Sequence, residues 1–183
     1  MKNKNKICTI EKAGSLDSRF RRLIQNPRKI LKPFIKEGMT VLDIGCGIGY
    51  FTLEIARMAG SSGKVYAADL QAEMLQTVKN KICGTPFEQI IHLHKCEENK
   101  TGLEENVDFV LAFYVVHEVP DQDAFFNEIY TILKPEGKML IVEPPFHVSG
   151  KEFRTMLHKI ENIGFKIISK PKYFMNKSAL VSK

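Results

Sequence analysis

The chain has 183 residues, 44% of them hydrophobic and 26% charged, which fits a single domain over residues 1–183 with a sizeable core. No run of about 18 apolar residues occurs, and the first ten residues, MKNKNKICTI, lack the apolar stretch of a signal peptide, so we expect a cytoplasmic protein without a membrane partner. The four cysteines have no C-x-x-C spacing, which argues against a zinc knuckle or a disulfide framework.

The net charge of +6 is concentrated near the N-terminus. Residues 1–38 hold eleven Lys and Arg against three acids, a net charge of +8 that leaves −2 for the remainder. A basic arm can contact nucleic acid or an anionic substrate, but it is more often a solvated surface, so nucleic acid is not the favoured partner. We expect helices within residues 14–38, and we interpret residues 1–38 as a helical lid segment beside a core of residues 39–183.

The stretch VLDIGCGIGY at residues 41–50 combines a short apolar strand with a loop that has a glycine at every second position. Glycine has no side chain and tolerates positive φ, so such a loop can turn sharply and bring its backbone against a flat or charged ligand. A helix is expected directly afterwards, because Phe51, Ile55 and Ala59 share one helical face. The segment is predicted to be a strand, a ligand-binding loop and a helix.

A second strand and helix follow. KVYAADL is a short apolar strand that ends near Asp69, and the next residues place Met74, Val78 and Ile82 at helical spacing. The sequence up to residue 82 therefore predicts a βαβα unit.

Three further apolar strands are expected, at residues 90–95, 107–113 and 138–143. The residues before the last of them predict a helix that buries Phe125, Ile129 and Leu133. Strands that are almost continuously apolar indicate a sheet covered on both faces.

The C-terminal part predicts one more helix and two strands. Ser149 and Glu152 have the S-x-x-E spacing of a capping box, the apolar face continues through Leu157, and Gly164 ends the helix. The runs at residues 164–174 and 177–183 are β-like and too close together for a crossover helix, so they are expected to be antiparallel.

Two carboxylates indicate which ligand the glycine loop binds. Asp43 lies two residues before the first glycine, where its carboxylate would repel a pyrophosphate and attract a cation. Asp69 ends the second strand, where an acid can accept hydrogen bonds from both hydroxyls of a ribose. The ligand therefore has a ribose and a positive end, and S-adenosylmethionine has both.

The motifs resemble those of a known family. VLDIGCGIG resembles the first motif of the S-adenosylmethionine-dependent methyltransferases with a Rossmann-like fold, VYAADLQAEML the second, VDFVLAFYVVHEV the fourth, and LKPEGKMLIVEPP the segment through the fifth strand. The overall pattern is most similar to small-molecule methyltransferases of the quinone-biosynthesis type. This resemblance implies an α/β fold, with a doubly wound, mostly parallel seven-stranded sheet whose last strand is antiparallel.

The resemblance also implies a set of cofactor-binding residues. The methionine end and sulfur of S-adenosylmethionine would be surrounded by Asp43, Gly45, Cys46, Gly47 and Gly49. The remaining contacts would come from Asp69 to the ribose, Leu70 to the adenine, Glu97 or Glu98 to the adenine amino group, and Phe113 at the end of the fourth strand.

The methyl acceptor is a small molecule in our interpretation. On the edge of the sheet where the strands end, His117 is the candidate general base, because a histidine titrates near neutral pH. Other polar side chains there, Glu118, Glu143 and His147, match no metal-binding motif, so no metal is expected. The alternatives are an RNA methyltransferase that uses the basic arm, and a non-catalytic S-adenosylmethionine sensor or partner subunit. A nicotinamide dehydrogenase is disfavoured by Asp43.

Overall fold

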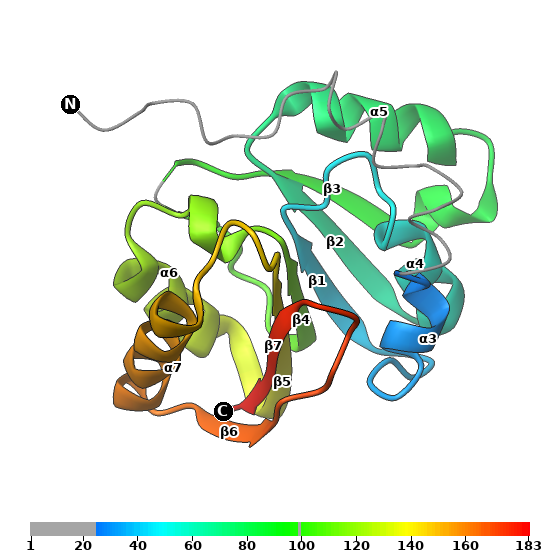
Figure 1. Cartoon of the computed structure of the whole chain (residues 1–183). Coiled ribbons are helices and arrows are strands. Elements are labelled where there is room, and N and C mark those ends of the chain that lie inside the picture. Colours follow the sequence, from blue (N-terminus) through cyan, green and yellow to red (C-terminus); the bar gives the residue numbers. More distant parts are fainter. Residues whose placement is uncertain (1–24, 99) are drawn as a thin grey trace.

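The structure is a computed structural model that describes residues 25–98 and 100–183, and its centre is a seven-stranded sheet of order β3-β2-β1-β4-β5-β7-β6 (Figure 1). The strands are β1 Thr40–Ile44, β2 Lys64–Asp69, β3 Ile91–Lys95, β4 Val107–Phe113, β5 Leu133–Glu143, β6 Lys166–Ser169 and β7 Lys177–Ser182. Strands β1 to β5 pair in parallel, and β7 is antiparallel to both of its neighbours. The expected α/β fold with an antiparallel last strand is confirmed.

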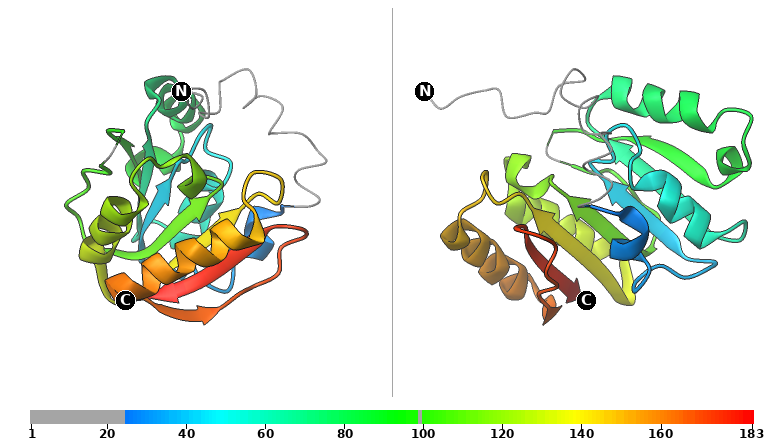
Figure 2. Two further views of the ribbon diagram at one scale, coloured as in Figure 1. Left: turned by 60° about the vertical axis from the view of Figure 1, so that its left-hand side comes forward. Right: turned by 45° about the vertical axis from the view of Figure 1, so that its right-hand side comes forward.

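Helices cover both faces of the sheet (Figure 2). They are α3 Pro27–Leu31, α4 Thr52–Ala59, α5 Ala72–Ile82, α6 Gln122–Ile132 and α7 Gly150–Ile163, with short 3-10 turns η1 Pro86–Gln89 and η2 Val116–Glu118. Side chains alternate along β1, so that Leu42 and Ile44 join the core with α6 and α7, whereas Val41 joins the core with α3, α4 and α5. Near-continuous apolar strands arise from burial on both faces.

Helix α7 has the ends that its sequence predicts. The Ser149 hydroxyl accepts a hydrogen bond from the backbone N–H of Glu152, and the Glu152 carboxylate accepts one from the backbone N–H of Ser149. The helix ends at Gly164, whose φ of 119° favours glycine, and it buries Phe153 and Leu157 against the sheet. The capping box and the core face are confirmed.

One expectation about helices was wrong, and another can be checked only in part. Leu133 is buried, but it starts β5 and does not belong to α6, which ends at Ile132, because Leu133 has the extended backbone that pairs with Val107 of β4. Within residues 25–38, only Pro27–Leu31 is α-helical. The remainder of the expected N-terminal helices, residues 14–24, lies outside the described residues, so the lid stays a prediction. No helix in the described ranges is long and apolar enough to cross a membrane.

Candidate functional site

A pocket of about 460 Å³ lies where the parallel strands end. Such an edge is where open α/β sheets bind ligands. Most of the residues expected to bind cofactor or acceptor line this one pocket: Asp43, Gly45, Cys46, Gly47, Asp69, Leu70, Glu97, Phe113 and His117. The tertiary structure thus brings together residues that are up to 74 positions apart, from Asp43 to His117.

The glycine loop is held open toward the pocket by its backbone. Gly45 and Gly47 both have positive φ, 67° and 53°. A Cβ on Gly45 would come within 2.7 Å of the Val115 side chain, whereas a Cβ on Gly47 would meet no atom within 4 Å. Gly49 does not line the pocket. A Cβ on Gly49 would come within 3.1 Å of the Val78 side chain of α5, so the missing side chain lets the loop pack closely on that helix.

Asp69 connects the end of β2 to the glycine loop. One carboxylate oxygen accepts a hydrogen bond from the backbone N–H of Gly47 at 2.8 Å, and the other accepts one from the N–H of Gln71 at 2.9 Å. Burial raises the pKa of this carboxyl, although these backbone donors oppose the rise. Each carboxylate oxygen has a second lone pair, so Asp69 can hold the loop and still accept ribose hydroxyls.

Asp43 is almost completely buried, with 2% of its surface exposed, and its carboxylate accepts a hydrogen bond from the Thr52 hydroxyl at 2.6 Å. Burial raises the pKa of Asp43 to about 7; the Thr52 hydrogen bond lowers it and the charge of Asp69 raises it further. A cation placed in the pocket would favour the ionised carboxylate. The electrostatics of this end of the pocket therefore suit a positively charged ligand.

The part of the pocket that contains the glycine loop, Asp43 and Asp69, called the cofactor half below, also has apolar lining. Leu70, Met74 and Phe113 line it, and the Phe113 ring lies 4.4 Å from the ring of Phe51. Glu97 and Glu98 both line the pocket and are both exposed, so the choice between them for the adenine amino group stays open.

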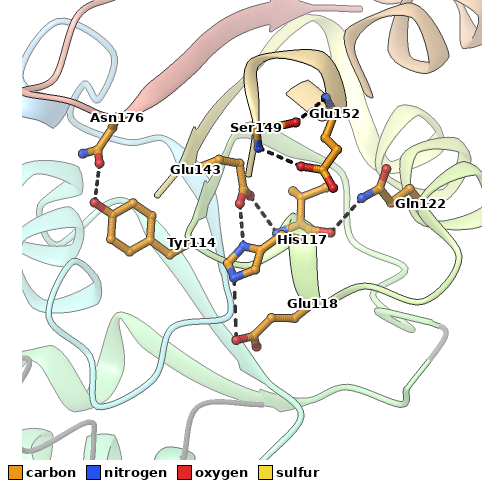
Figure 3. A network of polar contacts seen from close by, with 9 residues as sticks. Tyr114, His117, Glu118, Gln122, Glu143, Ser149, Glu152 and Asn176 are labelled. Atoms are coloured by element: carbon orange, nitrogen blue, oxygen red, sulfur yellow. Dashed lines mark hydrogen bonds and ion pairs between the residues drawn. The ribbon is translucent and has the colours of Figure 1, made fainter. Parts of the chain in front are cut away.

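On the acceptor side, His117 is held by a buried acid. Its Nδ1 lies 2.5 Å from a carboxylate oxygen of Glu143, at the end of β5, and the other oxygen of Glu143 accepts the backbone N–H of Val116 at 3.0 Å (Figure 3). Glu143 is fully buried behind His117 and does not line the pocket. His147 lies edge-on to His117, with ring centroids 5.5 Å apart. The site therefore contains an oriented Glu–His pair.

Glu118 is the second acid on this turn. Its carboxylate lies 3.9 Å from Nε2 of His117, and its pKa is raised by burial, with the neighbouring His117 lowering it. Within residues 25–98 and 100–183, no cluster of three or more His, Cys, Asp or Glu side chains is arranged to hold a metal ion.

Sequence reasoning missed two contributors to the pocket. Thr52, the hydrogen-bond partner of Asp43, had no role in the predictions. Tyr114 had no predicted role either: its hydroxyl donates a hydrogen bond to Asn176 at 2.6 Å and accepts one from the Gln25 side chain. Its positive φ of 65°, rare for a residue with a large side chain, is a tertiary feature with no sequence signal.

The pocket fits S-adenosylmethionine in three respects. The open space in front of Gly47 is a backbone cradle that a side chain would fill. Asp43 and Asp69 place carboxylates in the lining, as a ligand with a positive charge and a ribose requires, and apolar side chains line another part of the pocket, as an adenine requires.

Comparison with known proteins agrees with this geometry. A family profile described as "Methyltransferase domain" matches residues 35–173. The chain belongs to the methyltransferase domain family. A solved structure of a SAM-dependent methyltransferase from Aquifex aeolicus superimposes on this chain with a TM-score of 0.85 and 29% identity, covering 96% of this chain and 98% of that one. The resemblance predicted from the motifs, its fold and its cofactor class are confirmed.

Two curated relatives carry names from quinone biosynthesis. A demethylmenaquinone methyltransferase from Lactobacillus johnsonii is 34% identical to this chain over 110 residues, 60% of this chain and 45% of that protein. A ubiquinone/menaquinone biosynthesis C-methyltransferase from Hahella chejuensis is 31% identical over 113 residues, 61% of this chain and 45% of that protein. The matched part is thus less than half the length of these relatives.

Proposed function

We propose that this methyltransferase transfers the methyl group of S-adenosylmethionine to a small-molecule acceptor. The observation that carries the proposal is one pocket with a glycine cradle and two carboxylates at one end and an oriented Glu–His pair at the other. When bound, the cofactor supplies a methyl group on a sulfonium that is already a good leaving group. The protein therefore has to position the reactants and handle a proton.

The cofactor half positions its ligand through fixed groups. Gly47 presents open backbone, Asp69 accepts from the ribose, and the carboxylate of Asp43 attracts the positive end. These groups are fixed before the ligand arrives by hydrogen bonds that join β1, β2 and α4. Such preorganisation limits the ordering that binding has to impose.

The acceptor half provides a base. Because the Glu143 carboxylate accepts only, Nδ1 of neutral His117 carries the proton and Nε2 has the free lone pair. Nε2 can then take the proton of an acceptor hydroxyl or acidic carbon as the new bond to the methyl group forms, and the Glu143 carboxylate stabilises the resulting imidazolium. Since the Hahella relative is named a C-methyltransferase, an acceptor methylated on an activated ring carbon is the first class to test.

The cofactor site is tested by two matched glycine substitutions. Gly47 and Gly84 both have positive φ, 53° and 70°, and both have open space where a Cβ would point. Gly47→Ala and Gly84→Ala should each cost about 1–2 kcal/mol of stability from the left-handed backbone. Only Gly47→Ala should weaken S-adenosylmethionine binding in calorimetry, because Gly84 lies outside the pocket. Equal affinities in the two variants would contradict the cradle.

The reaction is tested with a methyl-labelled cofactor and metabolite extracts. Label should pass to a small molecule, and His117→Ala should lower turnover by roughly 10²–10⁴-fold while cofactor affinity stays nearly unchanged. Label in RNA, with binding that weakens steeply at higher salt, would support an RNA methyltransferase instead. Tight cofactor binding without transfer to any fraction would support a sensor or a partner subunit.

A further inference from the structure

Three of the four large hydrophobic side chains that are exposed in the described ranges belong to two neighbouring loops. Phe146 is 85% exposed, in the loop between β5 and α7. Phe174 and Met175 are 70% and 57% exposed, in the loop between β6 and β7. The fourth, Ile168, is 52% exposed and lies on the edge strand β6.

Strand pairing places these loops side by side. Glu143, the last residue of β5, pairs with Lys177, the first residue of β7, so both loops leave the same end of the sheet (Figure 2). The Lys177 ammonium donates to the carbonyl oxygen of Pro145 at 3.4 Å, which joins one loop to the other. Phe146, Phe174 and Met175 therefore lie on two adjoining loops at the same end of the sheet, and all three are exposed.

The second loop is built so that Phe174 points outward. Tyr173 packs against the core, and its carbonyl accepts the backbone N–H of Asn176 at 3.0 Å, which closes a turn. Phe174 has a φ of 50°, a conformation that bulky residues rarely adopt. The side chain of Asn176 anchors the turn to Tyr114 at the pocket.

The segments that carry these side chains are basic in composition. Residues 164–183 contain five lysines and no acid, and Lys170 and Lys172 are exposed within the loop that carries Phe174. The other loop, residues 144–149, contains no acid, and Lys151 in the first turn of α7 is exposed. An apolar centre with a basic rim is the composition of proteins that lie in the interface of an anionic membrane.

We propose that the basic apolar patch, defined as Phe146, Phe174, Met175, Lys170 and Lys172, binds the surface of a membrane that contains anionic lipids. The lysines contact the headgroups, and the three apolar side chains enter the headgroup–acyl boundary. The positive charge favours an anionic membrane over a second copy of the chain, because two copies joined through this patch would bring their lysines together and these would repel one another. This surface binding differs from the absence of a membrane partner expected from the sequence, since exposure of these side chains is set by the tertiary structure.

The patch lies beside the acceptor side of the pocket. Pro144 and His147, on the same loop as Phe146, line the pocket, and Asn176 bonds to Tyr114, which also lines it. Docking at the patch therefore places the pocket entrance next to the lipid, where an amphiphilic acceptor is concentrated. This last consequence alone rests on the proposed function.

Cosedimentation of the full chain with vesicles tests the patch. Wild type should bind phosphatidylcholine vesicles that contain phosphatidylglycerol, and raising the salt should weaken binding because screening shortens the range of the lysine charges. Phe146→Ser and Phe174→Asn together should lower the partition coefficient at least about tenfold. Asn is chosen at position 174 because it tolerates positive φ. Lys170→Gln and Lys172→Gln should each lower it about fivefold.

Matched controls separate the patch from general effects. Ile168→Ser removes an exposed apolar side chain outside the patch, and Lys32→Gln with Lys79→Gln removes two exposed charges elsewhere on the surface. These controls should bind vesicles like wild type, and all variants should bind S-adenosylmethionine equally in calorimetry.

Several outcomes would overturn the proposal. Wild type could fail to bind the anionic vesicles, or the patch variants could bind as well as their controls. Inorganic phosphate that released the protein at constant ionic strength would indicate a site for one phosphate group. Self-association that disappeared in the patch variants, without vesicle binding, would make the patch an interface between copies. In each case, intact cofactor binding and methyl transfer would leave the proposed function standing.

Discussion

Asp43 should make cofactor binding depend on pH. Its carboxyl is 2% exposed, and burial raises its pKa from 3.8 to about 7 in the free protein. A bound cation stabilises the ionised form and lowers this pKa, so S-adenosylmethionine should bind more tightly as the pH rises. A site that needed the protonated acid would show the opposite pH dependence, with weaker binding as the pH rises.

The size of the effect follows from the fraction of ionised Asp43. With a pKa of about 7, roughly a tenth of the free protein is ionised at pH 6 and roughly nine tenths at pH 8. If only the ionised form binds the cation, the dissociation constant should rise about tenfold from pH 8 to pH 6. Binding at pH 6 should release close to one proton per site.

Calorimetry in two buffers with different ionisation enthalpies measures both the affinity and the released proton. Asp43→Asn keeps the side-chain volume and should remove most of the pH dependence. Thr52→Val removes the hydrogen bond that lowers the pKa of Asp43, so the midpoint should move to higher pH. A dissociation constant that is the same at pH 6 and pH 8, or a pH dependence that persists in Asp43→Asn, would refute this reasoning.

Four further predictions follow from the same contacts. The raised pKa of Asp43 means that the folded state binds more protons than the unfolded state between about pH 4 and 7. The free protein should therefore lose up to about 4 kcal/mol of stability as the pH rises from 4 to 7. Urea unfolding can measure this loss, which Asp43→Asn should not show. Asp69→Ala should weaken cofactor binding by about 1–3 kcal/mol in calorimetry, and an unchanged dissociation constant would remove Asp69 from the site. Glu143→Gln should lower turnover while cofactor affinity stays nearly unchanged, because the imidazolium of His117 loses its counter-charge during proton transfer; turnover equal to that of wild type would show that the reaction does not need the Glu143–His117 contact. Ser149→Ala should cost about 1 kcal/mol of stability without affecting cofactor affinity, because it removes the cap of α7.

Local patterns in the sequence were sufficient for the elements that carry the cofactor half. Apolar strands, a glycine loop and acids at strand ends occur within residues 41–69, and their order alone placed Asp69 and the loop on one edge. The capping box of α7 is also local, since Ser149 and Glu152 are three residues apart. In each case the interacting groups are close in sequence or separated by one crossover, so spacing determines geometry.

Element boundaries were less predictable. Leu133 continues the apolar period of α6, but its pairing with Val107 makes it the first residue of β5. Helix periodicity and strand pairing compete at such a residue, and a partner distant in the sequence decides between them.

The proposed acceptor half of the pocket and the proposed basic apolar patch depend on the tertiary structure. His117 and Glu143 were both expected at the edge of the sheet, but only the adjacency of β4 and β5 puts the buried carboxylate 2.5 Å from the imidazole. Likewise, the pairing of Glu143 with Lys177 brings the loops that carry Phe146 and Phe174 to the same end of the sheet, although nothing in either loop indicates that its aromatic side chain is exposed. The sequence determines which chemical groups are present and the local backbone that carries them, whereas strand order, a sum of many long-range contacts, decides which groups meet and which face the solvent.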